Sequence, residues 1–413
     1  MCDILYIPPA FSQSGNLLFA KNSDREPDEA QAIELLPRNE APPENVNCTY
    51  ISIPRPHTTT YACIICRPLH MFGAEMGINE HGVAIGNEAV FTRIKLKRDN
   101  SGLTGMDLIR LALESSQNAS QALNLIVQLL EKHGQDACGG YRNRRFFYHN
   151  SFLIADAQEA FVLETAGKHW AVEPVTAVRS LSNCLSIKQP LRHSAHARSF
   201  AESKGWQPKD QPFNFSKAYS DWLYTRLGRG VKRAANSCNI ITSFGQPVTP
   251  AHCMQVLQSH HVPEKTFTPS RATTASICMH ATGIFNPSET TGSMVAEVRV
   301  NKAHTVWLTG TPHPCLSVFI PFFLPGKPFN LTPGCKPDDG LWWTAQRAHR
   351  RIMQDYQKRK ARIEPERQEL QNKFLSEEKY LIEQNAPASQ LQEFSKKCVE
   401  KTKATYRKWL EQF

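Results

Sequence analysis

Short β-rich runs joined by tight turns occupy most of the first 325 residues. Ile4–Ile7 and Leu17–Ala20 flank the turn sequence Ser14-Gly15-Asn16, a pattern that predicts a β-hairpin. Folding the chain about this turn brings the segment from Lys21 to Pro27 beside Cys2. Similar pairs of runs follow at 74–78 with 83–86, 152–155 with 160–164, and 294–298 with 305–308. A chain with this many hairpins must contain antiparallel strand pairs, because a short turn joins only antiparallel strands.

Helical patterns interrupt the strands in the middle of the chain. Leu108–Leu113 and Ala119–His133 carry apolar residues at helical spacing, and Gly134 supplies a C-cap for the second segment. Strand-like runs then dominate again as far as Pro325. The sequence therefore predicts an α+β protein.

The composition changes after the Pro- and Gly-rich stretch from Pro325 to Gly340. Beyond it the chain is polar and helical, which predicts a body of residues 2–325 and a basic helical extension of residues 341–413. Pro365 and Pro387 are expected to divide the extension into three helices, each with one narrow apolar stripe. A bundle packed on the body or on a second subunit fits this pattern, so a homo-oligomer is among the expected assemblies.

The net charge of +10 is concentrated in the extension. Residues 341–413 contain 16 Lys and Arg against 10 Asp and Glu, which accounts for +6 of the total. The body is only mildly basic, and it contains no Walker loop, dinucleotide fingerprint, HExxH motif or paired zinc knuckle. Nucleic acid is therefore not an expected partner.

The hydropathy pattern argues against a membrane protein. No apolar run reaches the roughly 20 residues that a membrane-spanning helix needs. The first residues have neither the basic region nor the continuous apolar region of an export signal. We therefore expect a cytoplasmic protein with no membrane span.

Twelve cysteines occur without regular spacing. In a cytoplasmic chain of this size they indicate buried or functional thiols rather than a disulfide framework. One CxxC motif is present, Cys63-Ile64-Ile65-Cys66, and its apolar interior predicts a strand whose thiols face one side. Since a zinc site of this type needs a second pair of ligands, we expect no metal and no cofactor.

A thiol directly behind the initiator is the most distinctive chemical feature of the chain. If Met1 is removed, Cys2 carries both a thiol and a free α-amine. A thiol of pKa about 8.5 is only slightly ionised at neutral pH, whereas an α-amine of pKa about 7.7–8.0 on the same residue is a suitable base. The alternative is that Cys2 is an ordinary small residue at a chain end.

The neighbouring polar residues suit an acyl-transfer site. The first hairpin places Lys21, whose charge lowers a thiol pKa, and Asp24, which can orient the amine, near Cys2. A tetrahedral intermediate also needs donors for its oxyanion, and a side-chain amide is a suitable neutral donor. Asn87 and Asn183 each stand at the end of a strand-like run, although either is equally explained as a turn residue.

Several sequence blocks, in order, resemble the secernin family, which is grouped with bacterial dipeptidases of the N-terminal-nucleophile hydrolase superfamily. The blocks are Met1-Cys2-Asp3, Lys21-Asn22-Ser23-Asp24-Arg25, Gly77-Ile78-Asn79-Glu80-His81-Gly82-Val83-Ala84-Ile85-Gly86-Asn87-Glu88-Ala89-Val90, Leu163-Glu164-Thr165-Ala166-Gly167, Thr309-Gly310-Thr311-Pro312 and Phe319-Ile320-Pro321-Phe322. The resemblance runs from Cys2 to about Phe323. It implies an αββα sandwich, in which two antiparallel sheets lie between helical layers and house an N-terminal cysteine nucleophile.

The resemblance also implies the site residues. The related choloylglycine hydrolases and penicillin V acylases carry an N-terminal Cys, an Arg-Asn-x-Asp motif, two Asn residues and a distal Arg. The matching positions here are Cys2, Asp24, Asn87 and Asn183, with Lys21 standing where those amidases have Arg. Arg226, Arg229 and Arg233 are the candidates for the distal Arg, and Arg233 is the one we select.

The resulting expectation is a cysteine-type dipeptidase that cleaves short linear peptides through a Cys2 thioester. One alternative is an amidase of N-acyl amino acids, which shares the nucleophile but differs in its pocket. Another is a secernin-like protein involved in interactions or secretion that has little catalysis. The expected ligand is a small peptide or N-acyl amide.

Overall fold

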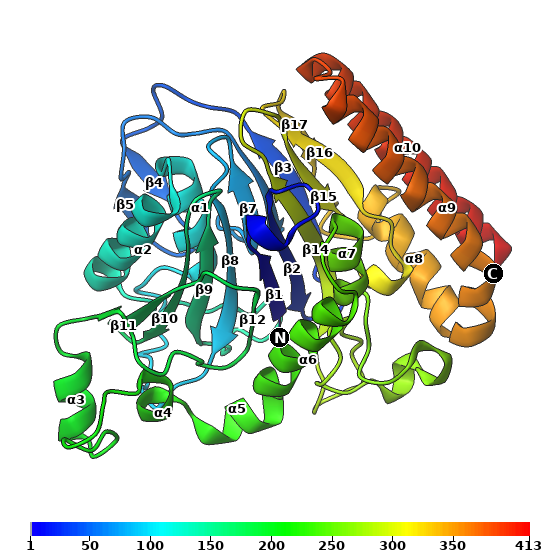
Figure 1. The fold of residues 1–413 in the computed structure, drawn as a ribbon. Coiled ribbons are helices and arrows are strands. Elements are labelled where there is room, and N and C mark those ends of the chain that lie inside the picture. Colours follow the sequence, from blue (N-terminus) through cyan, green and yellow to red (C-terminus); the bar gives the residue numbers. More distant parts are fainter. Residues whose placement is uncertain (1) are drawn as a thin grey trace.

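Two antiparallel sheets form the centre of the protein in the computed structural model, which describes residues 2–413 (Figure 1). The smaller sheet has six strands and contains the first hairpin of the chain. Its strands, in spatial order, are β12 (Arg179–Ser182), β1 (Cys2–Ile7), β2 (Leu17–Arg25), β14 (Glu289–Val298), β15 (His304–Leu308) and β16 (Ile320–Leu324).

The larger sheet has nine strands and holds most of the middle of the chain. Its strands, in spatial order, are β13 (Arg192–His193), β11 (His169–Pro174), β10 (Ala160–Ala166), β9 (His149–Ala155), β8 (Ala84–Val90), β7 (Met76–Asn79), β6 (Cys63–Pro68), β3 (Gln31–Leu36) and β17 (Phe329–Leu331). A separate two-stranded ribbon pairs β4 (Asn45–Asn47) with β5 (Ser52–Pro54).

The two sheets face each other across an apolar core. Ile4 and Phe19 of the smaller sheet belong to the same buried cluster as Ile78 and Leu153 of the larger one. A Cβ atom at Gly86 of β8 would lie only 2.7 Å from the Cδ atom of Lys21, so this close approach of the sheets requires glycine.

Helices cover the outer faces of both sheets. The larger sheet is covered by α1 (Gly105–Ser115) and α2 (Ala119–His133), which pack on β7, β8, β9 and β10. The smaller sheet is covered by α6 (Gly230–Ser243) and α7 (Pro250–Leu257), which pack on β12, β2 and β14. The long connection before α6 contains α3 (Ala197–Ser203), α4 (Phe215–Tyr219) and α5 (Trp222–Gly228). The predicted α+β class, with two antiparallel sheets and covering helices, is therefore confirmed.

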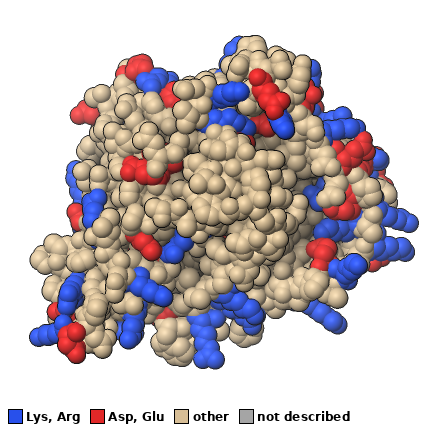
Figure 2. Space-filling model, viewed as in Figure 1, with Lys and Arg blue, Asp and Glu red and all other residues tan. Residues whose placement is uncertain are grey.

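Three C-terminal helices complete the molecule: α8 (Leu341–Met353), α9 (Tyr356–Glu383) and α10 (Ala388–Gln412). The α10 helix packs on β16 and α8, and the side chains of Tyr406 and Trp409 are fully buried there. In the face shown in Figure 2, acidic groups are interspersed with the Lys and Arg of these helices. The prediction of a helical extension is confirmed. Most of its buried apolar residues belong to the same hydrophobic cluster as the residues between the sheets, while Leu381 and Leu391 form a smaller cluster with Phe323.

Local structure follows the sequence closely in the hairpins. The turns contain Gly15 and Gly82 at φ +68° and +81°, conformations that glycine adopts without strain. The Thr104 side chain accepts from the main-chain N–H of Asp107, and the Asp107 carboxylate accepts from that of Thr104, so α1 begins with a capping box.

Three local predictions were wrong. Pro365 lies inside α9 rather than ending a helix, whereas Pro387 directly precedes α10 as expected. Strand β8 continues beyond Asn87 to Val90. The two thiols of the CxxC motif face opposite sides of β6, because side chains alternate between the two faces of a strand and these residues are three positions apart. Cys63 packs against the layer that contains α1, whereas the Cys66 thiol donates to Gln31.

Among residues 2–413, none of the helices combines the length and the apolar character that crossing a bilayer requires.

Candidate active site around Cys2

Cys2 begins β1 and faces the larger sheet. It lies opposite Ser23 of β2, and the hydroxyl of Ser23 accepts a 2.7 Å hydrogen bond from Gln31 of β3, a strand of the larger sheet. Since cross-strand partners share a face, the Cys2 thiol points into the space between the sheets, where the residue is 6% exposed. The hairpin thus brings Cys2 beside the Lys21–Arg25 segment, as the sequence predicted.

Asn183 holds the main-chain nitrogen of Cys2. This nitrogen donates to the Asn183 Oδ1 atom at 2.8 Å, and the Asn183 Nδ2 atom donates to the carbonyl oxygen of Ala89 at 2.8 Å. Asn183 follows β12 directly, and Ala89 belongs to β8 of the opposite sheet. One side-chain amide therefore links the start of β1 to both sheets.

Arg233 of α6 fixes this arrangement from the helical layer. Its guanidinium is fully buried and donates to Asn183 Oδ1 at 2.5 Å, to the Ser182 hydroxyl at 2.6 Å and to Asp3 Oδ1 at 3.1 Å. Arg226 and Arg229, the other two candidates for the distal Arg, are exposed. Among the three, the structure brings Arg233 to the N-terminal strand.

The thiol of Cys2 lies in a protected environment. Its Sγ atom accepts a hydrogen bond from the main-chain N–H of Asp24 at 3.4 Å. Burial raises the pKa of Cys2 to about 12, and the positive charge of Lys21 opposes this rise. At neutral pH the thiol is therefore protonated, and a nucleophilic role requires a proton acceptor close to it.

Lys21 and Arg25 share an acidic partner. The Nζ atom of Lys21 lies 3.8 Å from the Glu75 carboxylate, and the Arg25 guanidinium lies 3.0 Å from its other oxygen. Arg25 also pairs with Glu29 at 2.5 Å. The structure therefore places Lys21 beside Cys2 as expected, while Arg25 is engaged by the two glutamates.

Asp24 points to the other face of β2. Asn22, two residues earlier, donates to the carbonyl oxygen atoms of Leu257 and Ile277 on the side of the sheet covered by α7, and side chains two apart share a face. Thr290 donates a 2.5 Å hydrogen bond to Asp24 Oδ1. Burial nevertheless raises the pKa of Asp24 to about 7, so this carboxyl can change its protonation state near neutral pH.

Asn87 is not directed toward Cys2. Its Nδ2 atom donates to Asn150 Oδ1 at 2.9 Å and lies 3.6 Å from the sulfur of Met106 in α1. The preceding residue, Gly86, faces Lys21 across the sheet interface. Because faces alternate along a strand, the Asn87 side chain occupies the helix-covered side of β8.

Glu88 occupies the position that faces Cys2, and sequence reasoning missed it. This side chain is fully buried, and within residues 2–413 neither carboxylate oxygen has a hydrogen-bond partner. Burial raises the pKa of Glu88 well above its usual range, against the opposing effect of Lys21. Glu88 lies two positions after Gly86 on β8, so the two residues share a face of the strand, and this spacing was the signal in the sequence that could have identified Glu88.

A cavity of about 730 Å3 lies beyond the end of β8. Tyr148 lines this cavity, and its hydroxyl donates to the sulfur of Met106 at 3.4 Å. Burial raises the pKa of this hydroxyl. The lining combines aromatic and basic side chains, among them Phe91, Phe146, Tyr148, Tyr224, Lys95, Arg98 and Arg145.

Residues 11–169 match the sequence model of a family described as acyl-coenzyme A:6-aminopenicillanic acid acyl-transferase. This segment is less than half of the chain, and it contains Lys21, Asp24 and Asn87.

Among solved structures, penicillin V acylase from Agrobacterium tumefaciens is similar at 15% identity over 81% of this chain and 92% of its own, with a TM-score of 0.43. Conjugated bile acid hydrolase from Clostridium perfringens, in its C2A mutant, is similar at 12% identity over 74% of this chain and 88% of its own, with a TM-score of 0.42. A Caenorhabditis elegans ortholog of N-acylethanolamine-hydrolyzing acid amidase has 10% identity over 71% of this chain and 92% of its own, with a TM-score of 0.36.

Proposed function

We propose that this chain is an amidohydrolase whose nucleophile is Cys2 after removal of Met1. The observation that carries the proposal is the fixed position of the Cys2 nitrogen, held at 2.8 Å by Asn183 Oδ1 while the thiol of the same residue lies 3.4 Å from the Asp24 N–H. Once Met1 is absent, that nitrogen is an α-amine and can accept the proton of the thiol. The family match over residues 11–169 supports acyl chemistry.

In the proposed reaction the thiol proton moves to the α-amine as sulfur attacks the carbonyl carbon of the substrate. The ammonium then gives this proton to the departing amine, the C–N bond breaks, and a Cys2 thioester remains. Water, deprotonated by the free α-amine, attacks the thioester and releases the acid. The thiol is thereby restored.

Asn183 is the proposed oxyanion donor of this site. Its Nδ2 group belongs to the same side chain that holds the Cys2 nitrogen, so it lies near the reacting atoms, and it would exchange the Ala89 carbonyl oxygen for the oxyanion. Asn87, the other candidate, would also have to give up a hydrogen bond, to Asn150, and its side chain lies on the helix-covered side of β8, away from Cys2. Arg233 is proposed as a positioning residue that keeps Asn183 in place.

Short linear peptides, with dipeptides first, are the proposed substrates. N-acyl amino acids are the second candidate, and the cavity beyond β8 favours them. Its aromatic side chains suit an apolar acyl group, and its Lys and Arg residues suit a carboxylate.

A panel of dipeptides, N-acyl amino acids and penicillin V tests the proposal. We expect turnover of one of these amides by protein whose intact mass shows loss of Met1, and none by Cys2→Ala. Cys398→Ala is the matched control, because it removes a buried thiol of α10. Equal turnover by Cys2→Ala, or by protein that retains Met1, refutes the mechanism. A folded protein that turns over none of the panel favours a role in interactions instead.

A further inference from the structure

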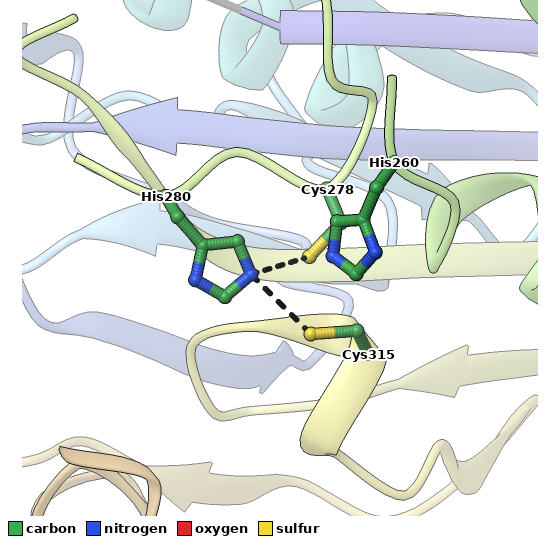
Figure 3. A group of neighbouring side chains, drawn as sticks. All are labelled: His260, Cys278, His280 and Cys315. Atoms are coloured by element: carbon green, nitrogen blue, oxygen red, sulfur yellow. Dashed lines mark hydrogen bonds between the residues drawn. The ribbon is translucent and has the colours of Figure 1, made fainter. Parts of the chain in front are cut away.

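Four side chains with metal-binding atoms converge on the side of the six-stranded sheet that α7 covers, and two of them, Cys278 and Cys315, belong to the hydrophobic core. His260, Cys278, His280 and Cys315 are all buried, and their nearest ligand atoms lie within 4.8 Å of one another (Figure 3). His260 follows α7, the pair Cys278 and His280 precedes β14, and Cys315 lies in a short 3-10 helix, Pro314–Leu316, between β15 and β16. Three segments distant in sequence thus contribute to one cluster.

Two distances within the cluster fit tetrahedral zinc. Zinc binds thiolate sulfur at about 2.3 Å and imidazole nitrogen at about 2.0–2.1 Å, so a tetrahedral angle separates these two ligands by roughly 3.5 Å. The Nε2 atom of His280 lies 3.5 Å from the sulfur of Cys278 and 3.4 Å from that of Cys315. Both separations agree with two atoms bound to one ion.

His260 has the orientation of a ligand. Its Nδ1 atom lies 2.9 Å from a carboxylate oxygen of Glu264, whereas its buried Nε2 atom has no hydrogen-bond partner within residues 2–413. A carboxylate on one ring nitrogen keeps the proton there and leaves the other nitrogen free to bind a metal. Glu264 is itself held by Tyr356 at 2.9 Å and Lys360 at 2.6 Å.

We propose that His260, Cys278, His280 and Cys315 bind one structural zinc ion. Four protein ligands close the coordination shell, and a site without an open position serves structure rather than catalysis. Two thiolates and two neutral imidazoles balance the charge of Zn2+, which suits a fully buried site. The proposal departs from the sequence-based expectation that the protein holds no metal, and it does not depend on the proposed function.

The zinc ion would also stabilise the loop that supports Asp24. Between Cys278 and His280, the Met279 N–H donates to the Thr290 hydroxyl at 2.8 Å, and Thr290 in turn donates to Asp24. Ile277, next to Cys278, accepts from Asn22 of β2 at 3.0 Å. The metal would therefore connect the irregular segment after α7 to the strand beside Cys2.

Elemental analysis of the full chain, purified without chelators, tests the proposal. We expect about one zinc per chain, retained in Cys2→Ala and in the control Cys398→Ser, and lost in Cys278→Ser and His280→Gln. Chelation should release the zinc and lower the thermal midpoint of the wild type but not change that of a folded Cys278→Ser variant. Full zinc content in both ligand variants would overturn the proposal.

Cobalt substitution of the wild type decides the matter if the ligand variants do not fold. Co2+ added to chelated protein should give the intense visible bands of a tetrahedral ion together with thiolate charge-transfer absorption. Absence of both zinc and cobalt binding in folded wild type would refute the site. An intact mass lower by two hydrogen atoms under non-reducing conditions, with Cys278 and Cys315 in one disulfide-linked peptide, would identify a disulfide in its place.

Discussion

Replacing Glu88 with glutamine should change how the stability of the protein depends on pH. Burial raises the pKa of Glu88 well above the value of 4.5 that applies to the unfolded chain. Between pH 4.5 and the raised pKa of the folded state, the unfolded chain has therefore lost a proton that the folded protein keeps. Stability from this group is fully present below the unfolded pKa and is lost as the pH rises toward the folded pKa.

The size of the effect follows from the one proton involved. Each pH unit between the unfolded and the folded pKa removes about 1.4 kcal/mol from the free energy of unfolding. Glu88→Gln carries no titrating proton and lacks this loss. An amide does not titrate, so the cost of burying it is the same at every pH. The substitution also breaks no hydrogen bond, because neither carboxylate oxygen of Glu88 has a partner within residues 2–413.

Urea denaturation of wild type and Glu88→Gln at pH 5, 6 and 7 measures the difference. The free energy of unfolding of the variant should rise relative to wild type by about 1.4 kcal/mol per pH unit as long as the pH is below the folded pKa of Glu88. Glu377→Gln, an exposed change on α9, controls for the loss of one carboxyl. A difference between Glu88→Gln and wild type that stays constant with pH would mean that Glu88 is ionised beside Lys21, and the reasoning would fail.

Four further predictions concern the surroundings of Cys2 and the C-terminal helices. Arg233→Met should lower the free energy of unfolding by about 3–5 kcal/mol, because it leaves Asp3 buried without its cation. Adding Asp3→Asn should recover part of this loss in urea denaturation, and equal stability of wild type and Arg233→Met would contradict the argument. Asn183→Ala should reduce turnover by roughly 10²–10³-fold, as loss of an oxyanion donor does. Asn87→Ala should act mainly on stability, by about 1–3 kcal/mol, because it leaves the buried Oδ1 atom of Asn150 without a donor. If Asn87→Ala lowered turnover and Asn183→Ala lowered only stability, the roles of the two residues would be exchanged. Deleting residues 388–413 should yield insoluble protein, since it uncovers the core around Tyr406 and Trp409; a soluble, cooperatively folding truncation would show that α10 is dispensable.

Local pattern was sufficient to predict the hairpins and their consequence for Cys2. A two-residue period, a glycine-containing turn and the short chain between the runs determine which residues pair. The proximity of Cys2 to Ser23 and Lys21 follows from the pairing of β1 with β2 alone. The same reasoning failed at Pro365, because packing of α9 against the body outweighs the lost hydrogen bond and the strain at one proline.

The face that each strand presents was harder to predict. Alternation shows that Asn87 and Glu88 point in opposite directions, but not which of them meets the other sheet. Contact between Gly86 and Lys21 determines this, and it depends on how the two sheets stack. The amide chemistry of Asn87 suggested it as the catalytic residue. In the structure, the side chain that faces the other sheet is instead the buried acid Glu88.

What the sequence by itself determined is therefore a part of what neighbouring residues decide together: the hairpins, the helices α1 and α2, and the thiol at the start of β1. Only the tertiary structure decided which distant groups meet. Arg233 reaches Asp3 across 230 positions, and Cys315 reaches His280 across 35. Sequence periodicity does not predict such contacts, because they form only when whole layers pack their apolar faces against each other and thereby position the polar side chains.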